Sequence, residues 1–253
     1  MAPGTLAALC FAALSAGTID AMAGGGGLIT VPALFAAGLP PTLVFGTNKA
    51  QSSFGSFAAL WRFWRAGLIV KAQFAGAFAA GFVGSLCGAR LVLVVPNAVL
   101  RPVVLVLLVM VAALLAFRRE QSPRALDLAP AQVSRRAALI AASVGAYDGF
   151  FGPGTGTFLI MARARFLGDT LKRASANAKV VNFASNLAAL CVFALKGVVL
   201  WRVALPMAAA QFVGGLLGAR LTVQGGDRWV RRAVLGVVAA LVCKLAYDLA
   251  PRS

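Results

Sequence analysis

GTIDAMAGGGG at residues 17–27 interrupts a long apolar run, and GAYDGFFGPGTG at residues 145–156 does the same in the second half of the chain. Both segments contain the pattern Gly-x-x-Asp-x-x-x-Gly-x-Gly. Glycine weakens a helix and frees backbone N–H and C=O groups, and a carboxylate within a membrane costs about 3 kcal/mol on insertion scales. Such a break is tolerated only where protein or a watery cavity surrounds it. The two breaks are therefore predicted to meet and to form a substrate site.

The composition predicts a membrane protein with several spanning segments. Hydrophobic residues make up 60% of the 253, charged residues make up 12%, and the mean hydropathy is +0.87. Soluble domains average about 45–50% apolar and about 25% charged residues. The 24 Lys and Arg, which give a net charge of +17, lie mostly between the apolar runs, as the positive-inside rule requires. The charge therefore indicates topology and not nucleic-acid binding.

Residues that could catalyse a reaction or bind a metal are scarce. The chain has no histidine, and its four cysteines each lie alone in an apolar segment without metal-ligand spacing. The sequence contains no nucleophile–base set, and the glycine breaks lack the Gly-Lys-Ser/Thr ending of a nucleotide-binding loop. We therefore expect no enzyme activity, no catalytic residue, no metal site and no cofactor.

The chain contains an internal repeat. FVGSLCGARL at residues 82–91 matches FVGGLLGARL at residues 212–221 at eight of ten positions, and an ungapped alignment of the preceding polar stretches pairs Asn48 with Asn177. The predicted organisation is a first membrane repeat at 1–117, a cytoplasmic linker at 118–136 and a second membrane repeat at 137–253. Each repeat has five apolar segments, at 5–23, 28–39, 42–64, 72–95 and 98–117, and at 137–150, 155–166, 171–195, 203–221 and 229–249.

The distribution of basic residues predicts how the repeats are related. If each repeat crosses the membrane five times, the second is inverted, and most Lys and Arg lie in inner loops. If each broken segment crosses only once, the repeats are parallel, and four basic residues between 163 and 173 face outside. The expected fold is therefore an all-α integral membrane protein of two five-segment halves forming an inverted repeat, each with a glycine-broken first helix and a short second helix. Re-entrant short helices are the alternative.

A polar stretch follows each short segment, GTNKAQSSFGS at 46–56 and SANAKVVNFASN at 175–186. Amides and hydroxyls can replace the water shell of an oxyanion, and free N–H groups at a helix start attract one. The alternative is that these side chains hold helices together, and for the serines and Asn186 the two are evenly balanced. The predicted substrate-binding residues are Gly24, Gly25, Gly26, Thr47, Asn48, Gln51, Ser52, Gly152, Gly154, Thr155, Asn177 and Asn182.

Four charged residues accompany these stretches, and we expect them to serve coupling or structure: Asp20, Asp148, Lys49 and Lys179. The aspartates have three candidate roles. They can relay protons if burial favours their neutral form, cap the N–H groups that the break frees, or pair with the two lysines. The lysines can add positive charge beside a bound anion.

Small residues recur four positions apart in the repeated glycine-arginine segments. They include Gly84 and Gly88 in the first half and Gly214 and Gly218 in the second. This spacing places small side chains on one face of a helix, where two backbones can approach each other. The pattern therefore predicts close helix packing and not a binding site.

At its motifs the chain resembles the sulfite exporter TauE/SafE family of membrane proteins, over nearly its full length. The matching features are the glycine run followed by Val31-Pro32, then GLPP at 38–41, GTN at 46–48 and DGFFGPGTG at 148–156. The family is linked to transmembrane movement of sulfur-containing anions such as sulfite, thiosulfate or sulfonated organic acids. The resemblance implies that Thr47, Asn48, Asn177 and the glycine breaks belong to the family's shared motifs.

Together these features predict a multi-pass secondary transporter of the cell inner membrane that moves a small anion by alternating access. A sulfur oxyanion or organosulfonate is the expected substrate, and another small organic acid is the alternative. An anion channel would use the same polar lining without alternating states, and a scaffold would give no flux. The expected partners are the small anionic substrate, the lipid bilayer and a second copy in a homodimer, with no nucleic acid.

Overall fold

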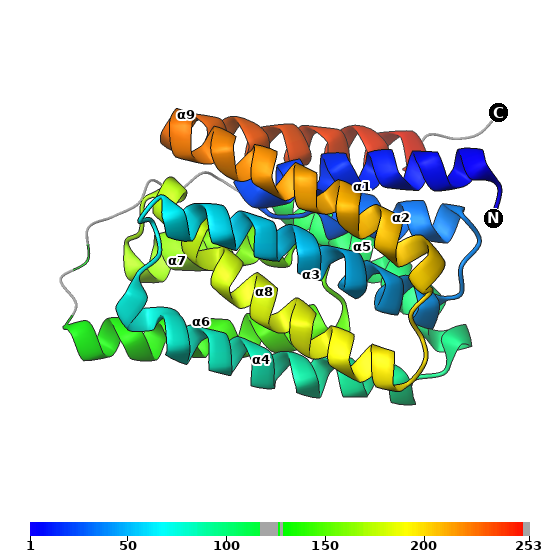
Figure 1. Cartoon of the computed structure of the whole chain (residues 1–253), viewed down its shortest axis with the longest axis horizontal. Helices are drawn as coiled ribbons and strands as arrows, with labels where there is room; N and C mark the ends of the chain where they lie inside the picture. Colours follow the sequence, from blue (N-terminus) through cyan, green and yellow to red (C-terminus); the bar gives the residue numbers. More distant parts are fainter. Residues whose placement is uncertain (117–125, 127–128, 250–253) are drawn as a thin grey trace.

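The computed structural model describes the backbone of residues 1–116, 126 and 129–249, and side chains as far as residue 226 except at 101, 105, 112 and 114–116. Residues 118–125 and 127–128 of the predicted linker lie outside the described residues. Those residues form helices and no strand (Figure 1): α1 (Pro3–Ala23), α2 (Gly27–Ala36), α3 (Pro41–Arg65), α4 (Lys71–Val94), α5 (Asn97–Ala116), α6 (Pro130–Phe150), α7 (Thr155–Leu167), α8 (Leu171–Leu195) and α9 (Trp201–Leu249).

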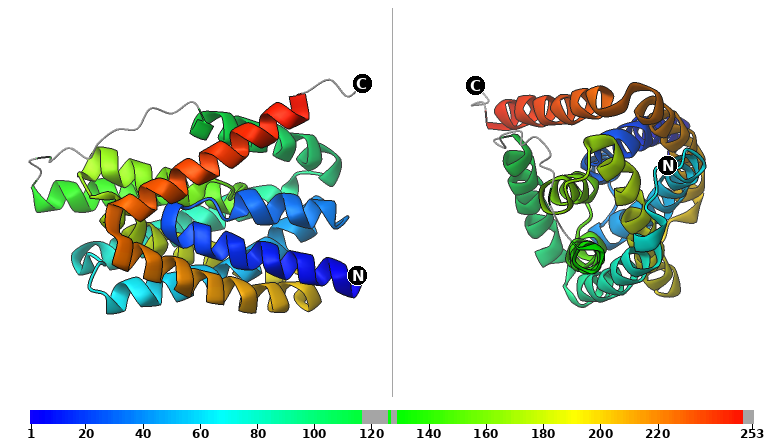
Figure 2. Two further views of the ribbon diagram at one scale, coloured as in Figure 1. Left: turned by 90° about the horizontal axis from the view of Figure 1, so that it is seen from above. Right: turned by 90° about the vertical axis from the view of Figure 1, so that its left-hand side faces the viewer.

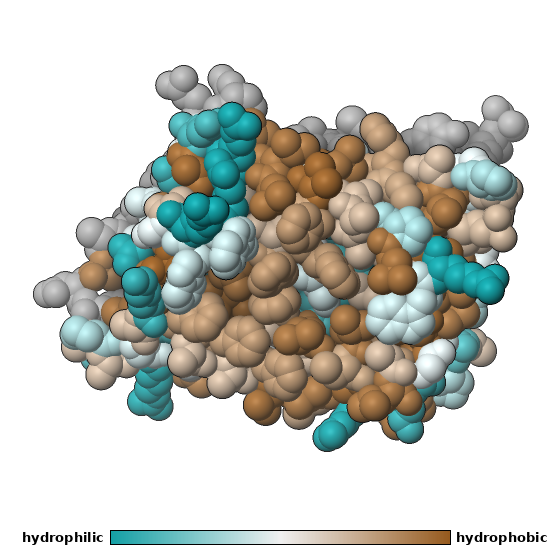
Figure 3. Space-filling model, viewed as in Figure 1, coloured by the Kyte–Doolittle hydropathy of each residue, from teal (hydrophilic) through white to brown (hydrophobic). Residues whose placement is uncertain are grey.

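Four of the described helices are long and apolar enough to cross a membrane: α1, α4, α8 and the part of α9 from Trp201 to Gly226. Helix α3 has 25 residues, as many as α8, but it carries Lys49 and the polar stretch at 46–56. Those polar side chains are turned inward, and Gln51 and Lys49 are at most 2% exposed. Figure 3 shows apolar residues across the middle of one face and hydrophilic residues gathered toward its two ends, as expected of a membrane protein.

Helix α9 consists of two arms. Gly226 lies between them with φ 59° and ψ −152°, a conformation that glycine adopts readily and other residues do not. The arms diverge from the bend between them like the sides of a V in Figure 2. They correspond to the two apolar segments predicted at 203–221 and 229–249.

The most extensive helix contacts join α1 to α9 and α4 to α6. A Cβ atom on Gly88 of α4 would overlap the carbonyl oxygen of Ala146 on α6, and one on Gly218 of α9 would overlap that of Thr18 on α1. This confirms the close packing predicted from the glycine spacing. Since α1 and α4 come from the first half and α6 and α9 from the second, each half packs its first helix against the other half.

Corresponding contacts recur in the two halves. The hydroxyl oxygen of Thr47 accepts a hydrogen bond from the N–H of Leu200, just before α9, and the amide oxygen of Asn177 accepts one from the N–H of Val70, just before α4. Thr47 and Asn177 are 130 residues apart in the sequence, and so are Val70 and Leu200. Thr47 therefore corresponds to Asn177, and by the same offset Lys49 corresponds to Lys179. The alignment that paired Asn48 with Asn177 was wrong by one residue.

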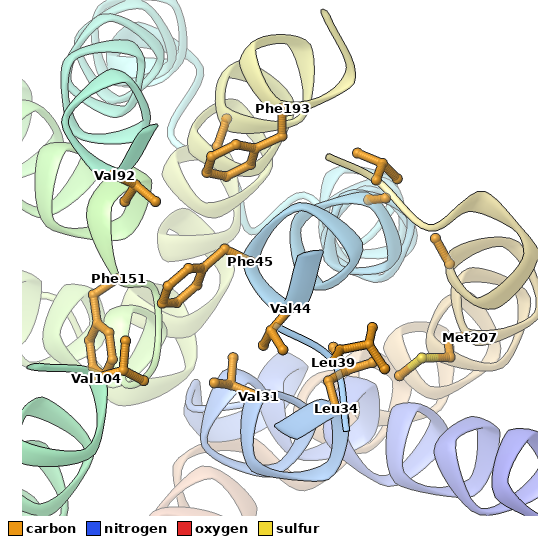
Figure 4. Close-up of a cluster of buried hydrophobic side chains, with 14 of the residues drawn as sticks. Val31, Leu34, Leu39, Val44, Phe45, Val92, Val104, Phe151, Phe193 and Met207 are labelled. Carbon is orange, nitrogen blue, oxygen red and sulfur yellow. The ribbon is translucent and has the colours of Figure 1, made fainter. Parts of the chain in front are cut away.

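The two polar helices occupy the centre of the molecule. In Figure 1, α3 runs from right to left and α8 from left to right, and the start of α1 and the end of α9 lie at the same end. Side chains from both halves share one buried apolar cluster, which includes Val31 and Phe45 with Phe151 and Phe193 (Figure 4). The Phe45 and Phe151 rings meet edge to face, with centroids 6.5 Å apart. This shared core holds the two breaks together.

Candidate functional site

The two glycine breaks contact each other. The hydroxyl of Thr157, in the first turn of α7, donates a 3.0 Å hydrogen bond to the carbonyl oxygen of Ala23, the last residue of α1. A Cβ atom on Gly24 would overlap the backbone of Gly156, and Gly24 has a φ of 74°. Glycine is therefore required at position 24 both for its backbone conformation and for the space. The prediction that the breaks meet is confirmed.

A pocket of about 20 Å³ lies where the breaks meet. That volume holds about one water molecule, so protein side chains fill most of the space between the breaks. The first residues of both short helices line it, which directs their free N–H groups and positive dipole ends toward it. Predicted residues that line the pocket are Asp20, Gly25, Gly26, Asn48, Lys49, Ser52, Asp148, Gly152, Thr155 and Asn182.

Two ion pairs with buried lysines cross the pocket region. Lys49 Nζ on α3 lies 2.8 Å from Asp148 Oδ1 on α6, and Lys179 Nζ on α8 lies 2.7 Å from Asp20 Oδ2 on α1. The lysine side chains are 2% and 0% exposed. Each pair joins a lysine of one half to an aspartate of the other. Pairing was one of the three roles predicted for the aspartates, and it is confirmed.

The aspartates also hold the starts of the short helices. Asp20 Oδ1 accepts a 3.2 Å hydrogen bond from the N–H of Gly26, the residue before α2. Asp148 Oδ1 accepts a 2.9 Å bond from the hydroxyl of Thr155, the first residue of α7, and its Oδ2 accepts one from Ser185. Each carboxylate therefore uses both oxygens. Asp20 combines ion pairing with a bond to a backbone N–H group of its break, whereas Asp148 combines ion pairing with bonds from two side-chain hydroxyls.

Amide oxygens around the pocket differ in how well their hydrogen-bonding capacity is used. Asn48 Oδ1 accepts bonds from Thr30 Oγ1 at 2.6 Å and from Gln51 Nε2 at 3.0 Å. Three buried amide oxygens have no partner among the described residues: Gln51 Oε1, Asn182 Oδ1 and Gln211 Oε1. An unpaired buried polar atom costs about 1–3 kcal/mol. These oxygens are therefore placed to accept from water or from a ligand.

Comparison with known proteins identifies the family. The family model described as "Sulfite exporter TauE/SafE" matches residues 9–245. The chain belongs to this family. It is 37% identical over 249 residues to "Probable membrane transporter protein YfcA" of Escherichia coli strain K12, with 98% of this chain and 92% of the relative covered. No solved structure matches it.

Two further relatives of this TauE/SafE protein have similar names. "Probable membrane transporter protein ORF9" of Sinorhizobium sp is 37% identical, covering 96% of this chain and 93% of the relative. "Probable membrane transporter protein" of Haemophilus influenzae is 35% identical, covering 96% and 95%. Together with the apolar helices, these matches make the chain a multi-pass membrane transporter.

Several predicted site residues of the TauE/SafE protein do not line the pocket: Gly24, Thr47, Gln51, Gly154, Asn177 and Lys179. Lys179 and Gln51 lie one contact away, bonded to Asp20 and Asn48. Besides bonding Val70, the side chain of Asn177 donates to the carbonyl oxygens of Leu68 at 3.2 Å and Arg173 at 2.8 Å. Thr47 and Asn177 thus anchor the starts of α9 and α4, in agreement with the alternative that polar side chains hold helices together.

Four other residues line the pocket: Gly27, Gly156, Asn186 and Gln211. The two glycines continue the breaks already identified, and Asn186 ends the polar stretch of α8. Gln211 comes from an apolar segment of α9 that was interpreted only as a membrane span. A single amide among apolar residues, immediately before the repeated FVGGLLGARL segment, was the signal that could have identified it.

Proposed function

We propose that this protein is a secondary transporter that moves a small anion, a sulfur oxyanion or an organosulfonate, by alternating access. The observation that carries the proposal is the pair of crossed lysine–aspartate contacts between the two halves, beside the starts of α2 and α7. The lysine ammonium groups contact the carboxylates of Asp148 and Asp20. A carboxylate resembles an oxyanion substrate, which could take its place beside the lysines.

The positive groups of the pocket suit an anion with several oxygens. Lys49 and Lys179 supply ammonium groups, and the starts of α2 and α7 supply N–H groups. Hydrogen bonds between charged groups are about twice as strong as neutral ones, and side-chain amides and Ser52 can satisfy the remaining oxygens. Family membership supports a sulfur anion, because the family's description names sulfite.

Alternating access is supported by the tightness of the site. A pocket of about 20 Å³ has room for about one water molecule, so an anion with several oxygens enters only if the side chains and ion pairs around it rearrange. We place the halves in an inverted repeat, since α3 and α8 run in opposite directions in Figure 1. An inverted repeat lets equivalent movements open the site to either side. We further place the protein in the cell inner membrane and expect a homodimer there.

Transport by purified protein in liposomes tests the function. Sulfite, thiosulfate, sulfoacetate, taurine and simple carboxylates are offered in turn, and uptake is measured with and without the same anion inside. We expect saturable uptake of at least one sulfur anion and acceleration by anion inside the vesicle, because a carrier exchanges its substrate. Saturable flux without such counterflow would identify a channel, and no flux of any anion would contradict transport.

Lysine variants locate the site within the same assay. Lys49→Met and Lys179→Met each remove an ammonium group that we assign to the anion, so uptake should fall at least about 100-fold if each contact contributes about 3 kcal/mol. Lys196→Met is the matched control, because Lys196 follows α8 and is exposed. Equal flux in all three variants would show that the anion binds elsewhere.

A further inference from the structure

The charges around the pocket sum to zero. Asp20 of α1 and Asp148 of α6 supply two carboxylates, and Lys49 of α3 and Lys179 of α8 supply two ammonium groups. The described residues that α2, α7 and α9 contribute to the pocket carry no charge. The nearby hydroxyl of Tyr147 on α6 donates to the carbonyl oxygen of Pro153. The empty site is therefore electrically balanced by its own side chains.

A bound dianion would upset this balance. Each lysine ammonium that contacts the anion either leaves its aspartate, which lies 2.7 or 2.8 Å away, or shares its three N–H donors between the aspartate and the anion. In either case the two ammonium groups would face four negative charges, two from the carboxylates and two from the dianion, and a buried charge that is not compensated costs several kcal/mol. The Asp148 side chain is only 5% exposed and the Asp20 side chain is 19% exposed, so bulk water compensates Asp148 very little and Asp20 only in part. The added negative charge has to be neutralised within the site.

We propose that Asp20 and Asp148 each take up a proton when the anion binds, so that one dianion crosses the membrane together with two protons. This inference rests on the proposed function. In the loading step, each carboxylate becomes a carboxylic acid with a proton from the side of entry, and its lysine pairs with an oxygen of the anion. In the release step, the anion leaves, each proton passes to water on the other side, and the ion pairs form again.

The unpaired amide oxygens support protonation. A carboxylic acid is a hydrogen-bond donor as well as an acceptor, and in the ion-paired state nothing in the described chain donates to Asn182 Oδ1, Gln211 Oε1 or Gln51 Oε1. The first two belong to residues that line the pocket with the aspartates. The site thus has hydrogen-bond acceptors that its own side chains leave without a donor while the ion pairs are formed. The rival use of these oxygens is a sodium ion, because amide and carboxylate oxygens also coordinate hard cations.

Proton counting in liposomes tests the coupling. Thiosulfate and sulfoacetate, both dianions at neutral pH, are given to sodium-free vesicles that contain a pH-sensitive dye, with the membrane potential set by potassium and valinomycin. We expect the lumen to acidify by two protons for each anion taken up, and uptake to be insensitive to the membrane potential. Uptake without acidification, uptake that requires sodium, or uptake accelerated by a positive interior would overturn the inference while leaving transport itself intact.

Variants assign the protons to the two aspartates. Asp20→Asn and Asp148→Asn each remove one carboxylate, so the ratio of protons to thiosulfate in the residual uptake should fall from two to one, and uptake should become faster with a positive interior. Asp169→Asn is the control, because Asp169 pairs with Arg163 at 2.7 Å and does not line the pocket. A wild-type ratio of two that both pocket variants retain would show that other groups carry the protons. If those variants do not fold, the ratio of protons to thiosulfate measured for the wild type still tests the proposal, because any value other than two contradicts it. Absence of uptake of every anion tested would instead contradict the proposed function itself.

Discussion

At the scale of single residues, the crossed ion pairs couple stability to function. Each buried lysine forms its ion pair with one aspartate, so removing one partner leaves a buried charge without its pair. Such pairs add little stability compared with apolar residues of similar size, although breaking one is costly. Asp20–Lys179 and Lys49–Asp148 are therefore better explained by a demand of function than by a demand of folding.

We predict that Asp148→Asn alone destabilises the protein more than Asp148→Asn combined with Lys49→Met. The single variant leaves the ammonium group of Lys49 buried without a counter-charge, at a cost of about 3–5 kcal/mol, and the double variant removes that charge. Thermal unfolding of the purified proteins in detergent measures the difference. If the double variant unfolds at a lower temperature than the single one, Lys49 does not depend on Asp148 for compensation.

Replacement of Asn177 should change the stability of the protein, whereas replacement of Asn48 should change its transport activity. Asn177→Leu leaves the N–H of Val70 and the carbonyl oxygen of Leu68 without their partner. This should lower the free energy of unfolding by about 1–3 kcal/mol, whereas the protein that does fold should transport anions as the wild type does. Asn48→Leu removes a polar group from the pocket and should abolish transport. Uptake normalised to folded protein checks both variants, and loss of normalised uptake in Asn177→Leu would place Asn177 at the site.

Most of the pocket could be predicted from the sequence, because charged and glycine-rich segments in a membrane have few other uses. Asp20, Asp148 and the glycines were found in this way. The partner of each aspartate could not be predicted, because the ion pairs cross between halves and depend on a register set by packing. Gln211 was missed for a similar reason. Its surroundings in sequence are apolar, and the contacts of α9 with α1 and α3 direct it to the pocket.

At the scale of helices, the backbone contacts of glycine set how closely pairs of helices approach. We predict that Gly88→Ala lowers the thermal stability, because its Cβ atom would overlap the carbonyl oxygen of Ala146 and force α4 away from α6. Gly76→Ala on the same helix is the control, since no atom lies within 4 Å of its added Cβ. That control should be neutral or stabilising by about 0.5–1 kcal/mol, because alanine favours helix over glycine. Thermal unfolding of the two variants compares them, and equal loss in both would contradict packing as the cause.

The helix boundaries were largely predictable, because glycine and proline mark them. The predicted and observed ends agree closely at the breaks and at Pro40-Pro41, where proline starts α3. The exception is α6, which begins at Pro130, about two turns before the apolar run at 137. Its first turns carry Arg135 and Arg136, which are exposed. Hydropathy identifies the part of a helix that lies in lipid, and it does not detect turns that extend into water.

At the scale of the whole molecule, the first helix of each half packs against the other half, so the two halves depend on each other. Helix α1 packs mainly against α9, and α6 packs mainly against α4. We predict that the chain divided between residues 117 and 129 transports anions only when both parts are produced in the same cell. Uptake by cells that express one part or both measures this. Transport by either part alone would show that a half can fold and function by itself.

The same packing between halves has a consequence for biogenesis. Helix α1 leaves the ribosome early, and its main packing partner begins only at Trp201. At about 5–20 residues per second, α1 waits in the bilayer for roughly 10–40 s with the face that packs against α9 uncovered and Asp20 without Lys179. During that interval a chaperone or the insertion machinery has to shield this helix, so the protein's yield in the cell depends on the supply of that help as well as on the stability of the finished fold.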